Sequence, residues 1–313
     1  MLAFLFPGQG SQFVGMGKAW RDSHDYVKEI FDQADEALSF SLSKLIFEGP
    51  AEELQKTANT QPAILTTSIA THEVLKRADI VPQVTAGHSL GEYASLVTAG
   101  ALEFGDAVRL VRLRGQFMQE AVPLGQGGMM AVLGLDAEKT VEGCRLAQEA
   151  GAGIVEVANF NSPGQVVVAG ESQALKKAQE TLKDLGAKRC MMLPVSAPFH
   201  CSLMIPAGER LAEELAKITI KDPLIPVVAN VNTEYVKSGE QVRELLIRQV
   251  SSPVLWEQSM RKLIADGCDV CVEIGPGNVL TGLMKKINRQ SKNFNCNGEG
   301  DPSVLISSLR ELL

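Results

Sequence analysis

Several features are missing from this 313-residue chain, and each absence argues against a class of protein. No run approaches the ~18 consecutive apolar residues of a membrane span. The apolar stretch at positions 1–6 ends at Pro7 and has no basic leader, unlike a secretory signal. Basic residues number 30 against 37 acidic ones, and this net charge of -7 disfavours a nucleic-acid partner. We expect a cytoplasmic protein that binds neither membranes nor nucleic acids.

The spacing of the cysteines indicates neither a disulfide framework nor a complete metal site. Six are scattered along the chain, and only Cys268 and Cys271 make a C-x-x-C pair. No second pair or histidine-rich segment lies nearby, and Val270, Val272 and Ile274 indicate a buried strand. We expect reduced, packed thiols, in preference to half of a zinc site or a redox pair.

The composition is 45% hydrophobic and 21% charged, as in ordinary globular proteins, and the length suits a large α/β domain with or without an insertion. Sequence patterns within one segment predict strands at 129–133, 154–158, 166–169 and 189–193, with helices at 136–150 and around 175–185. This β-α-β-β-α-β order predicts a ferredoxin-like subdomain at 125–195. The large domain would then comprise 1–124 and 196–313, with strands at 227–231 and 270–274 and a loose polar segment at 288–302.

The pattern with the clearest chemistry is Gly87-His88-Ser89-Leu90-Gly91. A β-branched segment at 80–84 precedes it, and residues 90–99 have helical composition. Strand, sharp turn and helix around Gly-x-Ser-x-Gly form the nucleophile-elbow pattern, in which the neighbouring chain leaves no room for side chains at the glycines. Ser89 would then be a nucleophile, with the Leu90 amide facing an oxyanion. The alternative is an ordinary glycine-rich turn in which Ser89 is a helix N-cap.

A partner base for Ser89 has to come from four histidines. His24 and His72 fall on amphipathic helices, where packing or surface roles are expected. His88 is fixed beside the nucleophile, so its ring is expected to pack outward. His200 lies in a loop held by two prolines at the return to the large domain, and we expect it to act as general base.

Arg114 occupies an unusual position in the helix predicted from 106 to about 121. It falls on the apolar stripe of that helix, where a leucine or valine would be expected. An inward arginine keeps its proton and therefore needs an anion. The partner could be an Asp or Glu in a salt bridge, or a substrate carboxylate bound by two N–H groups of the guanidinium fork.

A glycine-rich turn follows the first predicted strand. Gly8-x-Gly10-x-x-Phe13 lacks the third glycine of a dinucleotide-binding turn, so that fingerprint fails. The turn instead places Gln9 near the strand ends, where sites of open α/β sheets gather. Further along, residues 59–62 predict a cap and proline entry for a helix running to Lys76, which leaves Gln61 as a weak site candidate.

Together these segments resemble the malonyl-CoA:acyl carrier protein transacylase family of fatty-acid synthesis. The resemblance spans essentially the whole chain. The matching segments are Phe6-Pro7-Gly8-Gln9-Gly10-Ser11-Gln12, Asn59-Thr60-Gln61-Pro62-Ala63, Gly87-His88-Ser89-Leu90-Gly91-Glu92-Tyr93, Arg114 with Met118, Pro194-Val195-Ser196-Ala197-Pro198-Phe199-His200 and Gly275-Pro276-Gly277. One departure is Asn278, where many family members have lysine. The resemblance implies an α/β-hydrolase-like core with a parallel sheet and an inserted ferredoxin-like subdomain.

The resemblance also implies a role for each matching residue. Ser89 would be the nucleophile, His200 the base, and Gln9 with the Leu90 amide the oxyanion hole. Arg114 would bind the malonyl carboxylate, and a backbone carbonyl at Gln249 would orient His200. The remaining substrate-binding positions would be Gln61, Met118 and Asn159.

The implied activity is transfer of malonyl from malonyl-CoA to the phosphopantetheine thiol of acyl carrier protein, by a ping-pong mechanism through a malonyl-serine. No metal or cofactor is implied, because CoA enters as substrate and the partner carries phosphopantetheine. The acidic carrier would dock on basic residues, for which Arg189, Lys285 and Lys286 are candidates. The alternatives are a serine esterase or thioesterase, for which Asp184 is a possible third triad member, and a binding module without activity.

Overall fold

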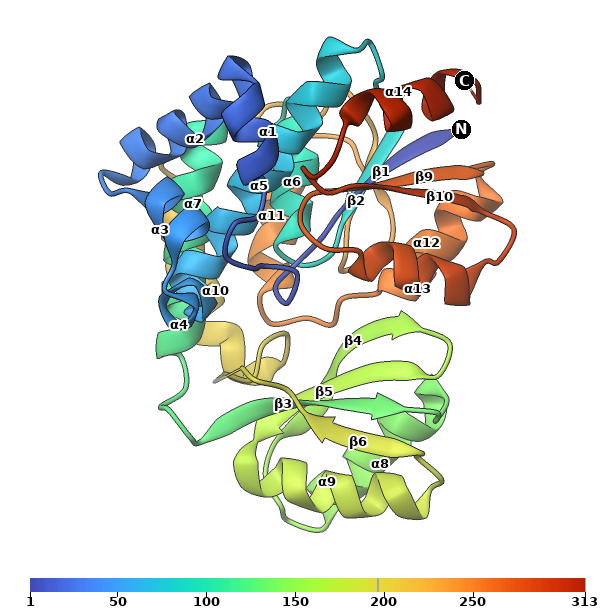
Figure 1. The fold of residues 1–313 in the computed structure, drawn as a ribbon. Coiled ribbons are helices and arrows are strands. Elements are labelled where there is room, and N and C mark those ends of the chain that lie inside the picture. Colours follow the sequence, from blue (N-terminus) through green and yellow to red (C-terminus); the bar gives the residue numbers. More distant parts are fainter. Residues whose placement is uncertain (196, 313) are drawn as a thin grey trace.

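The computed structural model describes residues 1–195 and 197–312, so Ser196, which the sequence analysis placed at a domain boundary, and Leu313 lie outside the described residues. The described chain contains two sheets, each with its own helices (Figure 1). The chain passes from the larger part to the smaller one after α7 (Phe104–Glu120) and returns after β6 (Arg189–Met192).

The large sheet is six-stranded and mostly parallel. Its order is β10 (Lys292–Cys296), β9 (Val270–Ile274), β1 (Leu2–Phe6), β2 (Val84–Gly87), β7 (Val227–Val228) and β8 (Tyr235–Val236). Only β8 is antiparallel to its neighbour. Every residue of β1, β2 and β9 is buried, as expected for parallel strands covered on both faces.

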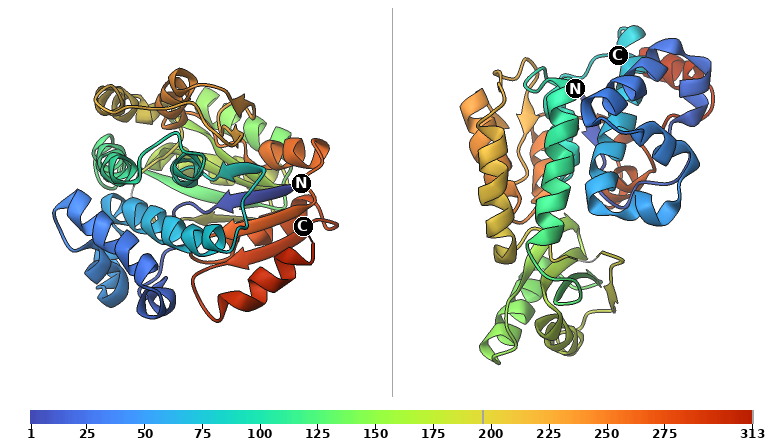
Figure 2. Two further views of the ribbon diagram at one scale, coloured as in Figure 1. Left: turned by 90° about the horizontal axis from the view of Figure 1, so that it is seen from above. Right: turned by 90° about the vertical axis from the view of Figure 1, so that its left-hand side faces the viewer.

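Helices pack on both faces of the large sheet (Figure 2). Alternate residues of β1 face opposite ways. Phe4 and Phe6 join the core shared with α5 (Thr57–Arg77), α6 (Gly91–Thr98) and α7, whereas Ala3 and Leu5 join the core shared with α12 (Trp256–Ala265) and α13 (Val279–Ile287). The helices of this part are α1 (Lys18–Ser23), α2 (Asp25–Leu38), α3 (Leu42–Glu48), α4 (Ala51–Gln55), α5 (Thr57–Arg77), α6 (Gly91–Thr98), α7, α10 (Ile205–Leu215), α11 (Gly239–Gln249), α12 (Trp256–Ala265), α13 (Val279–Ile287) and α14 (Pro302–Arg310), with a 3-10 turn at Ser202–Met204.

The small sheet is antiparallel, in the order β4 (Val155–Ser162), β5 (Gln165–Glu171), β3 (Gly127–Leu133) and β6. Helices α8 (Ala137–Glu149) and α9 (Ser172–Asp184) pack on it, so the order along the chain is β-α-β-β-α-β, as predicted. In the right-hand view of Figure 2, α7 runs down toward this part of the molecule.

A short backbone ladder joins the outer strand of the small sheet to the large part. The Phe160 amide donates to the Val254 carbonyl and the Val254 amide to the Ala158 carbonyl, each at 2.9 Å. The pairing of β4 with β5 shifts register between Val157 and Asn159, beside this bridge. Such an irregularity redirects side chains, and Asn159 lines the cavity described below.

Several predicted element bounds were wrong. The strand before Ser89 begins at Val84, because the proline at position 82 precedes it and interrupts the β-branched segment. The strand predicted at 227–231 covers only Val227–Val228. Residues 288–302 are not uniformly loose: β10 pairs along the edge of the large sheet, where its asparagines can reach water.

The helix that carries Gln61 also begins earlier than predicted. It starts at Thr57, so Pro62 lies inside the helix, and the Asn59 side chain donates to the Glu53 carbonyl at 2.8 Å. Pro62 is the sixth residue of this helix, beyond the first turn, so the helix lacks the hydrogen bond that an amide at position 62 would donate to the Ala58 carbonyl. No helix within residues 1–195 and 197–312 is long and apolar enough to cross a membrane.

Candidate active site

Ser89 lies in the turn between β2 and α6, in a backbone conformation that few serines adopt, with φ +52°. The glycines around it are sterically required. A Cβ added to Gly87 would lie 1.9 Å from the Gly91 carbonyl carbon, and one added to Gly91 would lie 2.0 Å from the Phe6 oxygen. The sequence therefore folds locally into a tight elbow that presents Ser89 at the start of a helix.

His200 is placed to exchange a proton with Ser89. Its Nε2 lies 2.6 Å from Ser89 Oγ, and its Nδ1 lies 2.9 Å from the Gln249 carbonyl oxygen. Because a carbonyl only accepts, Nδ1 carries the hydrogen and Nε2 is left to accept the serine proton. Burial, together with the nearby Arg114 charge, lowers the pKa of His200 to about 3, so the ring is neutral in the resting site.

Arg114 points into the same site from α7 and is 1% exposed. Its Nη1 donates to Gln61 Oε1 at 2.7 Å, and its Nη2 donates to Gln249 Oε1 at 3.0 Å and Ser89 Oγ at 3.1 Å. Burial lowers the pKa of this guanidinium, although Tyr93 and Glu92 oppose the change. None of the carboxylates in the described residues forms an ion pair with it, so the salt-bridge alternative does not apply.

The other predicted site residues surround a cavity of about 180 Å³ between the two sheets. Its walls include Gln9, Gln61, Ser89, Leu90, Arg114, Met118, Asn159 and His200. Gln9 Nε2 donates to Thr57 Oγ1 at 3.3 Å, and Gln61 Nε2 lies 3.8 Å from the Met118 sulfur. Gln249 does not line the cavity: it is fully buried behind Ser89 and reaches the site through His200 and Arg114.

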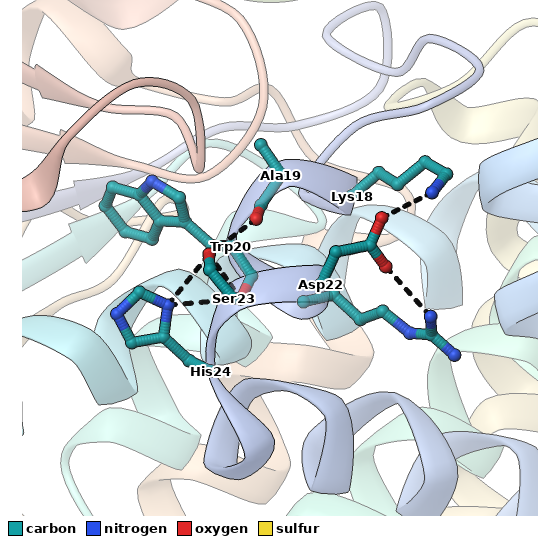
Figure 3. A network of polar contacts seen from close by, with 7 residues as sticks. Lys18, Ala19, Trp20, Asp22, Ser23 and His24 are labelled. Carbon is teal, nitrogen blue, oxygen red and sulfur yellow. Dashed lines mark hydrogen bonds and ion pairs between the residues drawn. The ribbon is translucent and has the colours of Figure 1, made fainter.

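The predicted outward packing of His88 was wrong. Its Nε2 lies 2.8 Å from Asn161 Oδ1 on the small sheet, and its ring centre is 5.5 Å from that of Trp256. The ring also borders the cavity, and burial lowers its pKa. His24 lies elsewhere, at the end of α1, where its Nδ1 contacts Ser23 Oγ at 3.1 Å (Figure 3).

Sequence reasoning missed two residues behind the elbow. Asn230 Oδ1 accepts from the Ser89 amide and Asn230 Nδ2 donates to the Gly87 carbonyl, both at 2.7 Å. Glu92 Oε2 accepts from Gln249 Nε2 at 2.7 Å and from the Asn230 amide at 3.1 Å. The signal for Asn230 was its place just after a parallel strand, on the site-forming side of the sheet.

No group of three or more histidine, cysteine, aspartate or glutamate side chains in the described part of the chain could hold a metal ion. Cys268 and Cys271 are buried free thiols, with their sulfurs 3.7 Å apart. Asp184, the possible triad acid, is an exposed residue at the end of α9, whereas the Nδ1 partner of His200 is a backbone carbonyl.

A family model described as an acyl transferase domain matches residues 3–306, which places the chain in that class. The malonyl CoA-acyl carrier protein transacylase of Bacillus subtilis (strain 168) is 50% identical, over 99% of this chain and 98% of its own. This chain belongs to the acyl transferase family and, within it, to the malonyl CoA-acyl carrier protein transacylases.

Solved structures agree with this assignment. The malonyl CoA-acyl carrier protein transacylase of Clostridium perfringens has a TM-score of 0.95 at 45% identity, covering 99% of this chain and 98% of that one. A malonyl-transacylase in complex with its type II PKS acyl-carrier protein has a TM-score of 0.94 at 43% identity, covering 99% of both chains.

Proposed function

We propose that this protein transfers the malonyl group from malonyl-CoA to the phosphopantetheine thiol of acyl carrier protein, by a ping-pong mechanism through a malonyl-serine. The observation that carries the proposal is Arg114. It is a buried guanidinium without an ion-pair partner among the described residues, and its Nη2 lies 3.1 Å from Ser89 Oγ. An acyl group with a terminal carboxylate, attached to Ser89, would supply the missing anion.

The first half-reaction acylates Ser89. His200 Nε2 takes the hydroxyl proton while Ser89 Oγ attacks the thioester carbonyl. The tetrahedral oxyanion is held by Gln9 Nε2 and the Leu90 amide, and the C–S bond then breaks. The proton on His200 goes to the leaving sulfur, so CoA departs as the thiol. The support for these roles is the 2.6 Å contact between Ser89 and His200 and the place of Gln9 and Leu90 in the cavity wall.

The second half-reaction repeats these steps with the carrier as nucleophile. His200 takes the proton of the phosphopantetheine thiol, the sulfur attacks the malonyl-serine carbonyl, and the C–O bond to Ser89 breaks. The proton returns to Ser89 Oγ. Only side chains, backbone and the two thioesters take part, so we expect no cofactor, with CoA acting as substrate and the partner protein carrying phosphopantetheine.

Substrate-binding roles extend the proposal to four further residues. Gln61 and Gln249 hold the Arg114 guanidinium through their side-chain oxygens, which leaves its charge for the substrate. Met118 packs against Gln61, and Asn159 faces the acyl group from the small sheet. The Gln249 carbonyl holds the tautomer of His200.

The architecture fits the same proposal. We assign the large part, residues 1–124 and 196–313, to an α/β-hydrolase-like acyltransferase domain, and 125–195 to a ferredoxin-like subdomain. The mostly parallel sheet with its elbow supports the first assignment, and the β-α-β-β-α-β order on an antiparallel sheet supports the second.

The acidic carrier would dock near Arg189, Lys285 and Lys286. A cytoplasmic location without nucleic-acid or membrane partners stays a prediction.

A denaturing mass spectrum after incubation with malonyl-CoA tests the proposal. We expect a covalent malonyl adduct that disappears when holo carrier protein is added and that Ser89→Ala does not form. A serine hydrolase would instead release malonate rapidly without transfer to the carrier. A chain that releases no CoA and forms no adduct would be a binding module.

A further inference from the structure

A buried carboxylate lies directly beneath the proposed site. Glu92 is on α6, three residues after Ser89, and is 1% exposed. Its Oε2 accepts from Gln249 Nε2 at 2.7 Å and from the Asn230 amide at 3.1 Å. Both of these partners are donors, an arrangement that favours an ionised carboxylate over a protonated one.

Gln249 connects this carboxylate to three residues of the site, Ser89, His200 and Arg114. Its side-chain oxygen accepts from Arg114 Nη2 at 3.0 Å, and its Nε2, which donates to Glu92, also lies 3.0 Å from the Ser89 carbonyl oxygen. Its own carbonyl holds His200 Nδ1. A Gln249 side chain turned away from Glu92 would lose all three side-chain contacts together.

Asn230 provides a second connection, to the elbow itself. Its backbone amide donates a hydrogen bond to Glu92. Its side chain accepts a hydrogen bond from the Ser89 amide and donates one to the Gly87 carbonyl. The left-handed backbone conformation at Ser89 costs free energy and persists only when the surroundings enforce it. Glu92 therefore acts on both sides of the nucleophile.

We propose that Glu92 is a positioning residue for acyl transfer, which holds Ser89, His200 and Arg114 in fixed relative positions through Gln249 and Asn230 without itself pairing with Arg114. The inference rests on the proposed malonyl transfer. Glu92 touches neither substrate nor reacting atoms, so its effect must pass through these neighbours.

The charge of Glu92 has two opposite consequences for the reaction. When His200 takes the serine proton, a second positive charge forms close to Arg114, and a nearby carboxylate stabilises it. The same carboxylate weakens the attraction of Arg114 for the substrate's carboxylate. Removing only the charge should therefore slow acylation while tightening the binding of malonyl-CoA.

The pH dependence gives an independent readout. Burial raises the pKa of Glu92 to about 7, whereas its hydrogen bonds from Gln249 and Asn230 and the Arg114 charge lower it. The titratable groups that face Glu92 are Tyr93 on its own helix and Arg114 on α7, and neither titrates near neutrality. Because the pKa of His200 is lowered to about 3, a rise in acylation rate through pH 7 would come from Glu92.

The test is Glu92→Gln, which keeps the side-chain length and an accepting oxygen, against Glu103→Gln, an exposed carboxylate paired with Lys221. Acylation by malonyl-CoA is followed by rapid quenching and mass spectrometry. For Glu92→Gln at pH 8 we expect the maximal rate to fall about tenfold, as for loss of a charged hydrogen bond. The half-saturating malonyl-CoA concentration should fall, the fraction of chains acylated should stay that of wild type, and the rise through pH 7 should disappear.

Other outcomes overturn the inference. An acylation rate equal to that of wild type in Glu92→Gln would overturn it. A smaller fraction of acylated chains that react at the wild-type rate would also overturn it, because that result indicates a structural role only. If Glu92→Gln does not fold, Gln249→Met takes its place in the test. This variant removes the side-chain link between Glu92 and Arg114 but keeps the backbone carbonyl that binds His200. An acylation rate equal to that of wild type in Gln249→Met would also overturn the inference. A wild-type protein that forms no malonyl adduct overturns the proposed function itself.

Discussion

Replacing Arg114 should change which acyl group the protein accepts. In Arg114→Ala the guanidinium near Ser89 Oγ is lost, and with it the two charge-assisted hydrogen bonds that a malonyl carboxylate would receive. Each such bond contributes about 1.5–3 kcal/mol. Allowing for the desolvation of the carboxylate, a net loss of roughly 3–4 kcal/mol lowers the malonyl acylation rate by about 10²–10³-fold.

The same replacement should leave acetyl transfer intact or improve it. An acetyl group has no carboxylate, so in the wild type it leaves a buried guanidinium without an anion in a desolvated site. The assay is acylation of Ser89 by malonyl-CoA and by acetyl-CoA in parallel, read as rate constants. The matched control is Arg109→Ala on the same helix, which removes an arginine that is exposed and paired with Asp106.

Arg114→Lys separates charge from shape, because it keeps the positive charge but loses the planar fork. We expect a malonyl rate between those of wild type and Arg114→Ala. An unchanged ratio of malonyl to acetyl rates in Arg114→Ala would refute the reasoning, whatever the absolute rates. A parallel fall of both rates would show that Arg114 supports the site without selecting its substrate.

Three further results are expected. Gly87→Ala should abolish acylation and lower the melting temperature, because its Cβ would overlap the backbone of Gly91, and a wild-type melting curve would contradict this. The pKa of His200 is lowered to about 3 in the folded protein, so as the pH falls below 6.5 this histidine is protonated in the unfolded state but not in the folded one. At pH 5 the difference lowers the free energy of unfolding by roughly 2 kcal/mol. Urea unfolding at pH 7 and 5 should show a smaller acid-induced loss in His200→Gln than in wild type. Charge reversal at Lys285 and Lys286 together should raise the KM for carrier protein but not for malonyl-CoA, and an unchanged carrier KM would move the docking surface elsewhere.

Short-range patterns made part of this structure predictable. The elbow follows from glycine spacing between a strand and a helix, because its steric requirement is local. The β-α-β-β-α-β order followed from alternating periodicities and turn residues within one continuous segment. The position of Arg114 on an apolar stripe predicted that it would be buried.

Long-range contacts were not predictable in the same way. β10 is an edge strand that pairs with β9, but its polar composition resembles that of a loop, so the sequence pattern did not indicate a strand there. Glu92 and Asn230 meet across more than a hundred residues of chain, and no local pattern reports such a contact. Family resemblance supplied the Gln249 carbonyl, which periodicity and spacing could not have identified.

The ladder between β4 and the Val254 segment covers part of an edge strand of the small sheet. An outer strand with free backbone groups is a template on which a second chain can add a strand and begin aggregation. The bonds at Ala158 and Phe160 occupy that border of the small sheet from within the same molecule. Mutations that loosen this ladder would therefore be expected to reduce solubility, and to displace Asn159 from the cavity wall.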